Sequence, residues 1–467
     1  MGEEASALPG GDPARGAPPL ALLGLALAVA ACYATAFLGD FQFDDLNVIV
    51  REPRVASLPA WWASLPGIRP ALKLSFALNQ ASGLGLLGFH LANVGIHIVN
   101  ALLAYGVLSR LGPRVPGAAL LGALLFALHP VQTEAVTYVS GRSSSLSATF
   151  ALSSVLLWLE GRERGKPVLS RALSPALFLG SLLVKESAIV LPFGLLLVLA
   201  SFGPRPFRWR DALRATSLHF AVLAAAAAAL LLAPPYRRML ELAFALRTPS
   251  ANLLTHAQAV LWLAGQVVRI DLLNADPALP AAGALTAVSA ARAALVLLAA
   301  AAGLAFVRSG WGFALLWFLL WLPPSGWLVP RPEPANDRQL YLALLGPAWL
   351  AGRLLAVSRA RRVAALALAL LLGIATAARN LVYRDPVRFW EDVVRKSPGN
   401  ARAYNNLGFS LAAACRIPEA DRALVHALEI DPEFVRAAVN LRLLREGEPL
   451  EPPSPRQRRC KAPAPDR

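Results

Sequence analysis

The sequence predicts an all-α protein made of membrane-spanning helices, followed by a short soluble helical segment. Two properties support this prediction. The 467-residue chain is 56% hydrophobic and has a mean hydropathy of +0.51, which is too apolar for a soluble globular protein of average composition. Its apolar residues also gather in windows long enough to cross, or nearly cross, a bilayer. A polytopic helical membrane protein is therefore expected.

The N-terminal segment, residues 1–17, is expected to be disordered and cytoplasmic. It contains Glu3, Glu4 and Asp12 and lacks the basic n-region of a secretory signal. The first apolar window is therefore expected to be a retained anchor and not a cleaved signal peptide.

A transmembrane domain with about eleven spans is predicted over residues 18–380. The eleven apolar windows are 18–37, 89–109, 117–130, 143–160, 172–184, 187–202, 216–233, 291–307, 311–329, 339–356 and 363–379. A further stretch, 252–270, is broken by polar residues that include His256 and Gln266. We interpret it as an interfacial or re-entrant helix, because the basic clusters between the windows then lie on one side.

The basic residues indicate membrane topology and argue against nucleic-acid binding. The formal net charge is +16, but the charges fall in short clusters between apolar windows, as topology determinants do. The clusters are Arg110/Arg114, Arg162/Arg164/Lys166/Arg171, Arg205/Arg208/Arg210/Arg214, Arg308 and Arg353/Arg359/Arg361/Arg362. We place them on the cytoplasmic side. Arg237, Arg238 and Arg247 then lie on the opposite side, against the general trend.

Residues 381–447 are expected to form a soluble segment of tetratricopeptide repeats on the non-cytoplasmic side. The positions that follow the 34-residue pattern are Tyr404, Leu407, Gly408, Leu411, Ala420, Leu424, Ala427 and Pro432. Pro398 lies 34 residues before Pro432, so residues 386–398 are interpreted as half of a degenerate preceding repeat. So few repeats need support from the membrane domain or from a partner. The tail, 448–467, is rich in Pro and Arg and is expected to be disordered.

Two adjacent carboxylates lie in the first outer loop, which is predicted over residues 38–88. Asp44 and Asp45 end the run Phe41-Gln42-Phe43-Asp44-Asp45, a few residues beyond the first apolar window. Like charges repel and raise one pKa of such a pair, so the two residues indicate chemistry or ion binding. The alternative is a solvated acidic turn at a helix exit.

A polar stripe is predicted on the second span. His90, Asn93 and His97 are spaced by three and four residues and therefore share one helical face. Such a stripe normally faces protein or a watery cavity, and hydrogen bonding between helices is favoured here over metal binding. The three cysteines are widely separated and lack zinc-site spacing. Neither a metal site nor a disulfide framework is predicted.

Further charged residues lie at the predicted outer ends of the spans. Glu134 either positions a substrate or pairs with Arg142. Lys185 and Glu186, between two windows, form either a self-contained ion pair or part of a buried site. Arg338, at the entrance of a span, either snorkels to the headgroups or binds a lipid-linked phosphate.

The motifs, taken in order, resemble those of a known family. They are Phe43-Asp44-Asp45, Arg69-Pro70 with Ser75-Phe76 and Asn79, Phe89-His90 with Asn93 and His97, His129-Pro130 with Thr133-Glu134, Gly141-Arg142, Lys185-Glu186 with Pro192, and Arg338 with Tyr341. From about residue 36 to residue 445 the sequence resembles the transmembrane O-mannosyltransferases with tetratricopeptide repeats. Its short repeat region and its Ala/Leu/Arg bias are similar to those of a bacterial relative.

This resemblance implies a C-type glycosyltransferase fold that takes a sugar from polyprenyl phosphate. The sugar, with mannose as the candidate, would pass with inversion to a hydroxyl of a protein or glycan acceptor on the non-cytoplasmic face. Asp44 or Asp45 would be the general base. Substrate-binding roles would fall to Arg69, Glu134, Arg142, Lys185, Glu186 and Arg338.

The resemblance also implies cofactor needs, partners and a location. No cofactor is implied, because a monophosphate donor need not use a divalent ion. The repeats would bind a protein partner, and the enzyme would lie in a bacterial inner membrane with its site on the periplasmic side.

Two rival functions are open at this point. One is a polymerase or ligase of lipid-linked oligosaccharides, which a diphosphate donor would favour. The other is a non-enzymatic membrane scaffold, in which the repeats recruit partners and the polar residues only hold helices together.

Overall fold

The computed structural model describes residues 18–65, 67–322, 326, 329–331, 333–448 and 450. The predicted disordered N-terminus, 1–17, and almost all of the predicted tail lie outside these residues. The described part of the chain is helical and contains no strand, so the all-α prediction is confirmed.

Within the described ranges, five helical segments are long and apolar enough to cross a membrane. They are Pro19–Leu38, which contains α1 (Pro19–Cys32), Gly85–Leu108 (α4), Trp209–Leu232 (α10), Ala287–Ala305 (α13) and Arg359–Arg384, which contains α17 (Arg359–Asn380). A bent pair of helices, Ala118–Ala127 and Pro130–Val136, makes a sixth candidate with a 50° bend. The chain is therefore a multi-pass membrane protein.

The other predicted windows coincide with shorter or more polar helices. These are α7 (Arg142–Glu163), α8 (Ser174–Val184), α9 (Leu191–Phe202), α14 (Gly310–Trp321), α15 (Leu340–Ala343) and α16 (Leu345–Leu355). They pack with α4 and α5 (Ala118–Ala127) around the main hydrophobic core. The number of spans, predicted as eleven, is not established by helix length and composition.

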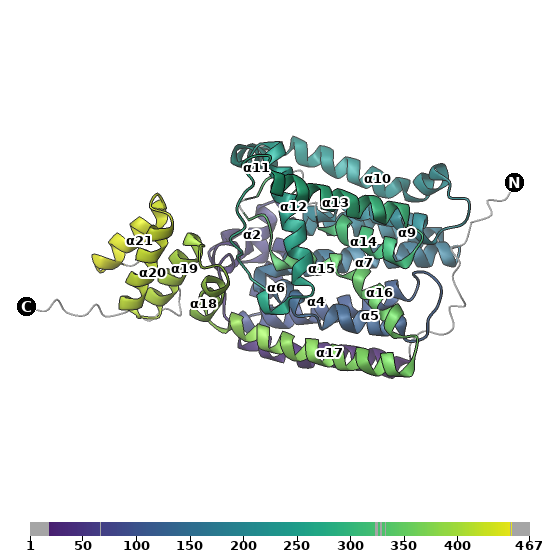
Figure 1. Cartoon of the computed structure of the whole chain (residues 1–467), viewed down its shortest axis with the longest axis horizontal. Helices are drawn as coiled ribbons and strands as arrows, with labels where there is room; N and C mark the ends of the chain where they lie inside the picture. The colour runs from purple at the N-terminus through teal and green to yellow at the C-terminus, as the bar shows by residue number, and fades with distance from the viewer. Residues whose placement is uncertain are drawn as a thin grey trace, which may run out of the picture.

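The stretch that was excluded as a span forms α12 (Pro249–Gln266). It is not among the helices that could cross a membrane. Figure 1 shows α12 running across the long helices α10, α13 and α17, near the end of the bundle that faces the C-terminal helices. Its polar residues Asn252, Thr255 and His256 are buried, which agrees with the predicted interfacial or re-entrant position.

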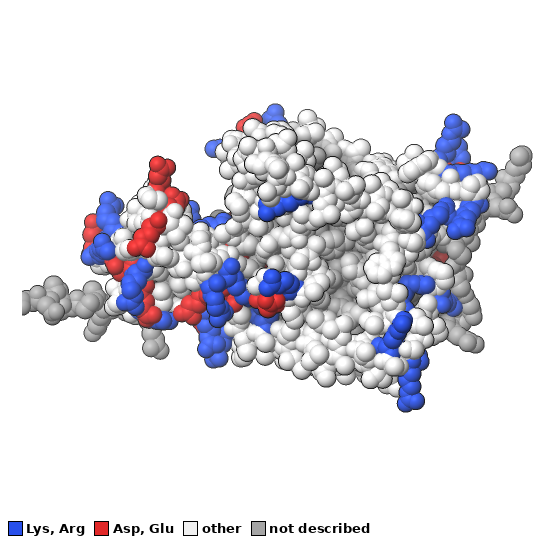
Figure 2. All heavy atoms as spheres, viewed as in Figure 1, with Lys and Arg blue, Asp and Glu red and all other residues white. Residues whose placement is uncertain are grey.

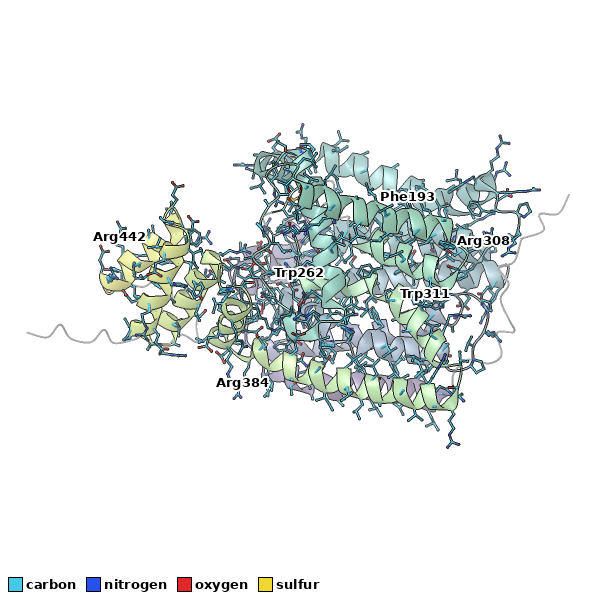
Figure 3. All side chains as sticks on the ribbon, viewed as in Figure 1. Phe193, Trp262, Arg308, Trp311, Arg384 and Arg442 are labelled. Atoms are coloured by element: carbon cyan, nitrogen blue, oxygen red, sulfur yellow. The ribbon has the colours of Figure 1, made fainter. Side chains whose placement is uncertain are left out.

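The basic clusters gather at one end of the bundle. Figure 2 shows Lys and Arg with few acidic neighbours at the end opposite to the C-terminal helices, whereas those near the C-terminal helices are mixed with Asp and Glu. Arg308, at the cluster end, is labelled in Figure 3. One hollow at this end is lined by Pro18, Arg114 and Arg353 together. The leucines along the long helices face outward, for example Leu298 and Leu370, as a lipid-facing surface requires.

Four helices lie beyond the other end of the bundle (Figure 1). They are α18 (Pro386–Lys396), α19 (Ala401–Ala413), α20 (Ile417–Ile430) and α21 (Val435–Arg445). Gly408 of α19 lies so close to Leu424 of α20 that an added Cβ would be 2.7 Å from its Cγ, which explains the small residue there. Cys415, between these helices, is disulfide-bonded, a single bond that the sequence analysis did not predict.

The C-terminal helices pack directly on the bundle. A second hydrophobic cluster joins Tyr138 and Tyr383 of the bundle end to Phe389, Trp390 and Val393 of α18. This contact supports the short C-terminal helices, as expected for a segment too short to form a core of its own. It also brings α18 and α19 next to the first outer loop, because Phe43 packs against the same cluster.

Candidate active site

The predicted acidic pair lies at the end of the bundle that carries α18 and α19. Phe43, just before the pair, has a positive φ of 41°, which is unfavourable for a residue with a side chain. Its ring packs edge-on against Trp390 at 5.3 Å between centroids, and the Arg402 guanidinium lies 5.9 Å above it. Contacts from the C-terminal helices thus hold the backbone that presents the pair.

Asp45 is fully buried and bonded on both carboxyl oxygens. Its Oδ1 accepts the backbone N–H of Ser140 at 2.7 Å and its Oδ2 accepts that of Gln42 at 3.0 Å. Burial raises the pKa of Asp45 to about 7, against these hydrogen bonds, which lower it. Asp45 therefore ties the first outer loop to the turn at Ser140, and both of its oxygens are occupied.

Asp44 has a different environment. Its backbone N–H donates to the Tyr138 hydroxyl at 2.9 Å, and its side chain remains partly exposed. Burial raises the pKa of the Asp44 carboxyl, whereas the charges of Arg338 and Arg402 lower it. The carboxyl is thus accessible and lies near two cations, so the structure separates the two members of the pair.

Glu134 and Arg338 form a buried ion pair near Asp44. The Glu134 carboxyl accepts the Arg338 backbone N–H at 3.0 Å and lies 3.5 Å from its Nε. The Arg338 guanidinium also lies 5.7 Å from the centroid of the Tyr138 ring. Burial opposes the charge of Arg338, but Glu134, Tyr138 and Asp44 outweigh this effect and raise its pKa. The alternative pairing of Glu134 with Arg142 is wrong.

Arg142 instead binds neutral groups inside the protein. It is 1% exposed, and its guanidinium donates to Asn93 Oδ1 at 2.6 Å, to the Phe89 carbonyl at 3.0 Å and to the Ser75 carbonyl at 3.1 Å. It also lies 5.0 Å from the centroid of the Phe76 ring. These contacts join the start of α7 to α4 and to the first outer loop at Ser75. Arg142 therefore has a structural role. The adjoining Gly141 is needed because an added Cβ would be 2.1 Å from the Glu134 carbonyl oxygen.

Arg69 and Glu186 form a bidentate pair. Arg69, with a positive φ of 52°, donates from Nε at 3.0 Å to Oε1 and from its terminal nitrogen at 2.7 Å to Oε2 of Glu186. The Tyr236 hydroxyl donates to the same carboxyl at 3.1 Å. Burial opposes ionisation, but Arg69 outweighs it and lowers the pKa of Glu186 to about 2. Glu186 thus pairs with Arg69 and not with the adjacent Lys185.

Lys185 is buried among like charges. Its Nζ donates to Ser144 Oγ at 2.6 Å, and the described part of the chain gives it no carboxylate within ion-pair distance. Burial lowers its pKa well below the usual range, and the charges of Arg338, Arg331 and Arg69 lower it further. We call Arg69, Lys185, Arg331 and Arg338 the cation cluster. Several cations around a poorly compensated lysine favour binding of an anion.

Arg331 and Arg402 were missed by the sequence analysis. Each lies in a segment predicted to be on the outer side, but neither belongs to a motif. Arg331 is one of several arginines near a predicted helix end, where snorkelling is a sufficient explanation. Arg402 lies in the soluble segment, which was considered only as a partner-binding unit. The only sequence feature that could have indicated these two arginines was their predicted position on the outer side. Many neighbouring residues share that position, so it does not single them out.

The polar stripe on α4 confirms the favoured interpretation. His97 lies between the Tyr341 hydroxyl, 2.6 Å from Nδ1, and the Ala127 carbonyl, 2.9 Å from Nε2. The Asn93 side chain donates to the Val136 carbonyl at 2.9 Å. These are hydrogen bonds between helices. Among the residues that the structure describes, no group of three or more His, Cys, Asp or Glu side chains is arranged to hold a metal ion.

An apolar hollow lies apart from these residues. It has a volume of about 660 Å³ and lies between α12, α13, α14 and α16. Its lining includes Val267, Phe306, Trp311 and Phe318 and none of the predicted site residues. Trp311 is labelled near the basic end in Figure 3. This hollow is therefore not part of the candidate site.

Comparison with known proteins agrees with the motifs. The chain is 33% identical over 206 residues to protein O-mannosyl-transferase TMTC1 of Mus musculus, a match that covers 38% of this chain and 22% of the relative. It is 36% identical over 154 residues to TMTC4 of Homo sapiens, covering 27% and 21%. The corresponding values for Tmtc1 of Drosophila melanogaster are 40% over 141 residues, covering 29% and 16%.

The chain resembles the transmembrane protein O-mannosyl-transferases. The resemblance stated from the motifs is therefore confirmed. The chain spans about a quarter or less of the length of these relatives. No family model matches the chain, and no solved structure matches it.

Proposed function

We propose that this protein is a membrane glycosyltransferase with polyprenyl-phosphate mannose as its donor. The acceptor is a hydroxyl of a protein or glycan on the non-cytoplasmic face. The observation that carries the proposal is the accessible carboxyl of Asp44 beside the cation cluster, with Arg338 near both. The named relatives support the sugar and the reaction class, because each is called a protein O-mannosyl-transferase.

The proposed reaction needs one base and a site for the leaving group. The Asp44 carboxylate takes the proton of the acceptor hydroxyl as its oxygen bonds to the anomeric carbon. The bond from that carbon to the phosphate oxygen breaks on the opposite side, and the phosphate leaves with the electron pair. The cation cluster stabilises the charge that develops on the phosphate. Attack and departure on opposite sides invert the anomeric centre.

The remaining predicted site residues receive supporting roles in this proposal. Glu134 holds Arg338 in place through the ion pair, and Glu186 does the same for Arg69. Asp45 and Arg142 position the first outer loop and the ends of α4 and α7, because their polar atoms are already bonded within the protein. The proposal invokes no metal ion, because four basic side chains are available to one monophosphate.

We further propose eleven spans, a C-type glycosyltransferase fold and tetratricopeptide repeats in α18–α21. In this topology the basic clusters face the cytoplasm and Asp44 faces the opposite side, because Phe43 before it packs against the C-terminal helices at the other end of the bundle (Figure 1). The disulfide of Cys415 is consistent with an oxidising compartment for the C-terminal helices. The predicted bacterial inner membrane has no support from the named relatives, which are animal proteins.

Cysteine labelling tests this topology. Cysteines introduced at Ser397 and at Ser358 are expected to react with a membrane-impermeant maleimide from opposite sides of sealed vesicles. Ser358 precedes α17 and Ser397 follows α18. If α17 spans the membrane, the chain crosses it once between these two residues. Labelling of both cysteines from the same side would refute the proposed orientation.

Incubation with labelled donors tests the reaction. Purified protein is mixed with a membrane extract and with tritiated mannose on polyprenyl phosphate, or on polyprenyl diphosphate. Transfer from the monophosphate to protease-sensitive material is expected. Preference for the diphosphate would favour the polymerase or ligase, whereas consumption of neither donor would favour the scaffold.

Lys185→Met is expected to weaken donor use without destabilising the protein. The substitution removes a buried charge that is repelled by Arg69, Arg331 and Arg338, so the melting temperature should hold or rise. The KM for the donor should rise about 10- to 100-fold, because a charge-assisted hydrogen bond to phosphate is lost.

Lys166→Met is the matched control for this variant. Lys166 is exposed, follows α7 within one of the basic clusters, and is not part of the cation cluster. Its replacement should leave the KM for the donor unchanged. An unchanged KM in Lys185→Met as well would remove Lys185 from the proposed phosphate site.

A further inference from the structure

We propose that Arg402, on the soluble helix α19, is a positioning residue for Asp44, so that the C-terminal helices complete the active site. This inference rests on the proposed function, because it concerns the same proton transfer. It goes beyond a partner-binding role for these helices.

Arg402 connects three segments around the site. Its Nε donates to the Asp276 carboxyl at 3.0 Å, and a terminal nitrogen donates to Glu333 at 2.7 Å. Its guanidinium lies over the ring of Phe43, the strained residue before Asp44. Asp276 and Glu333 come from two outer segments of the membrane domain. The side chain therefore lies between α19, these two segments and the first outer loop.

The position of Arg402 is fixed by further hydrogen bonds at the start of α19. Asn400 caps the helix by accepting the Ala403 backbone N–H at 3.1 Å, and its Nδ2 donates to the Asp276 carbonyl at 3.0 Å. One turn earlier, Lys396 donates to the Leu273 carbonyl at 2.7 Å. These bonds fasten α18 and α19 to residues 273–276, so the guanidinium is held beside the site by a rigid element.

The charges around Asp44 explain what Arg402 does there. The charges of Arg338 and Arg402 lower the pKa of the Asp44 carboxyl, and the charge of Glu333 raises it. The Tyr138 hydroxyl accepts the Asp44 backbone N–H, and Asp45 is the next residue. Without Arg402, the negative charge of Glu333 would act on Asp44 with less opposition. Asp44 would then hold its proton to higher pH and would be a poorer base near neutrality. The contact of Arg402 with Phe43 orients the same carboxyl through the backbone.

Three variants separate this role from simple docking of the helices. Arg402→Met removes the charge, and Arg445→Met is the control, because Arg445 pairs with Asp421 within the C-terminal helices at 2.7 Å. The double variant Asp276→Arg/Arg402→Asp keeps an ion pair across the interface but reverses the charge that faces Asp44.

Two measurements are made on each full-length variant in detergent. The first is the pH dependence of mannose transfer from tritiated polyprenyl-phosphate mannose to a membrane extract. The second is the pH dependence of carbodiimide labelling of Asp44, followed by mass spectrometry, which requires no donor. Melting temperatures report whether the helices remain docked.

Arg402→Met is expected to shift the acidic limb of the transfer profile and the labelling midpoint of Asp44 upward by about one pH unit. Arg445→Met should match the wild-type protein. The charge-reversed pair should regain part of the melting temperature, because it restores the ion pair between positions 276 and 402 but places a carboxylate beside Glu333. It should not regain the wild-type limb. The inference would be overturned if Arg402→Met kept the wild-type labelling midpoint of Asp44. It would also be overturned if the charge-reversed pair regained both the wild-type melting temperature and the wild-type acidic limb.

The design also distinguishes failure of the proposed function. If the wild-type protein transfers no mannose, the proposed reaction fails, while carbodiimide labelling still decides whether Arg402 controls Asp44. If Asp44→Asn abolishes transfer but Arg402→Met leaves the profile unchanged, only the inference on Arg402 fails.

Discussion

Asp44→Asn is expected to lower the turnover of mannose transfer about 10²- to 10⁴-fold without unfolding the protein. The substitution preserves the size of the side chain and removes only its ability to accept a proton. Asp44 is partly exposed, and its carboxyl has one hydrogen-bond partner, the Tyr138 hydroxyl, which also accepts the Asp44 backbone N–H. Little of the fold therefore depends on its carboxyl.

Asp45→Asn is expected to behave in the opposite way. Both oxygens of Asp45 accept backbone N–H groups, and an amide nitrogen in place of one oxygen would face a donor. Such an unsatisfied buried contact costs about 1–3 kcal/mol. The melting temperature should fall, whereas the protein that remains folded should retain most of its turnover.

The two variants are compared by transfer of labelled mannose and by thermal melting in detergent. Asp271→Asn is a suitable control, because Asp271 forms an exposed ion pair with Arg269. If Asp44→Asn remained active while Asp45→Asn lost turnover at full stability, the assignment of the base to Asp44 would be reversed. If both retained activity, the enzymatic proposal would fail and the scaffold would be favoured.

Arg338→Met is the second substitution with a large expected effect. Arg338 belongs to the cation cluster and lies near Asp44, so its loss should lower turnover about 10²- to 10³-fold. It should also destabilise the protein by on the order of 3 kcal/mol, because the buried carboxyl of Glu134 loses its ion-pair partner.

A double variant separates these two effects. Glu134→Gln/Arg338→Met removes the stranded negative charge while the amide oxygen still accepts the backbone N–H of residue 338. Its melting temperature should recover toward that of the wild-type protein, but its turnover should not. Arg269→Met, at an exposed pair, is the control. Recovery of turnover together with stability would show that Arg338 acts only through folding.

Local patterns in the sequence predicted the helices and the region of the site. Each apolar window coincides with a helix or part of one, and the polar stretch 252–270 forms a helix that is not among the candidate spans. These features depend on composition and spacing over about 20 neighbouring residues, which are visible in the sequence. The motifs also placed Asp44, Lys185 and Arg338 on one side of the membrane domain.

The roles of individual residues could not be predicted in the same way. Asp44 and Asp45 are equivalent in sequence, but the carboxyl of Asp45 accepts the backbone N–H of Ser140, 95 residues away, as well as that of Gln42. Arg142 looked like a substrate ligand, but three groups from two other segments bind its guanidinium.

The sequence by itself determined that this is a helical membrane protein with a gathering of charged residues at one end. The tertiary structure alone decided which carboxyl is accessible, which ion pairs form, and that Arg402 reaches the site from the soluble helices. The physical reason is one of range. Apolar burial is additive along a helix and follows local composition, whereas the charge state and accessibility of one side chain depend on partners that only folding brings together.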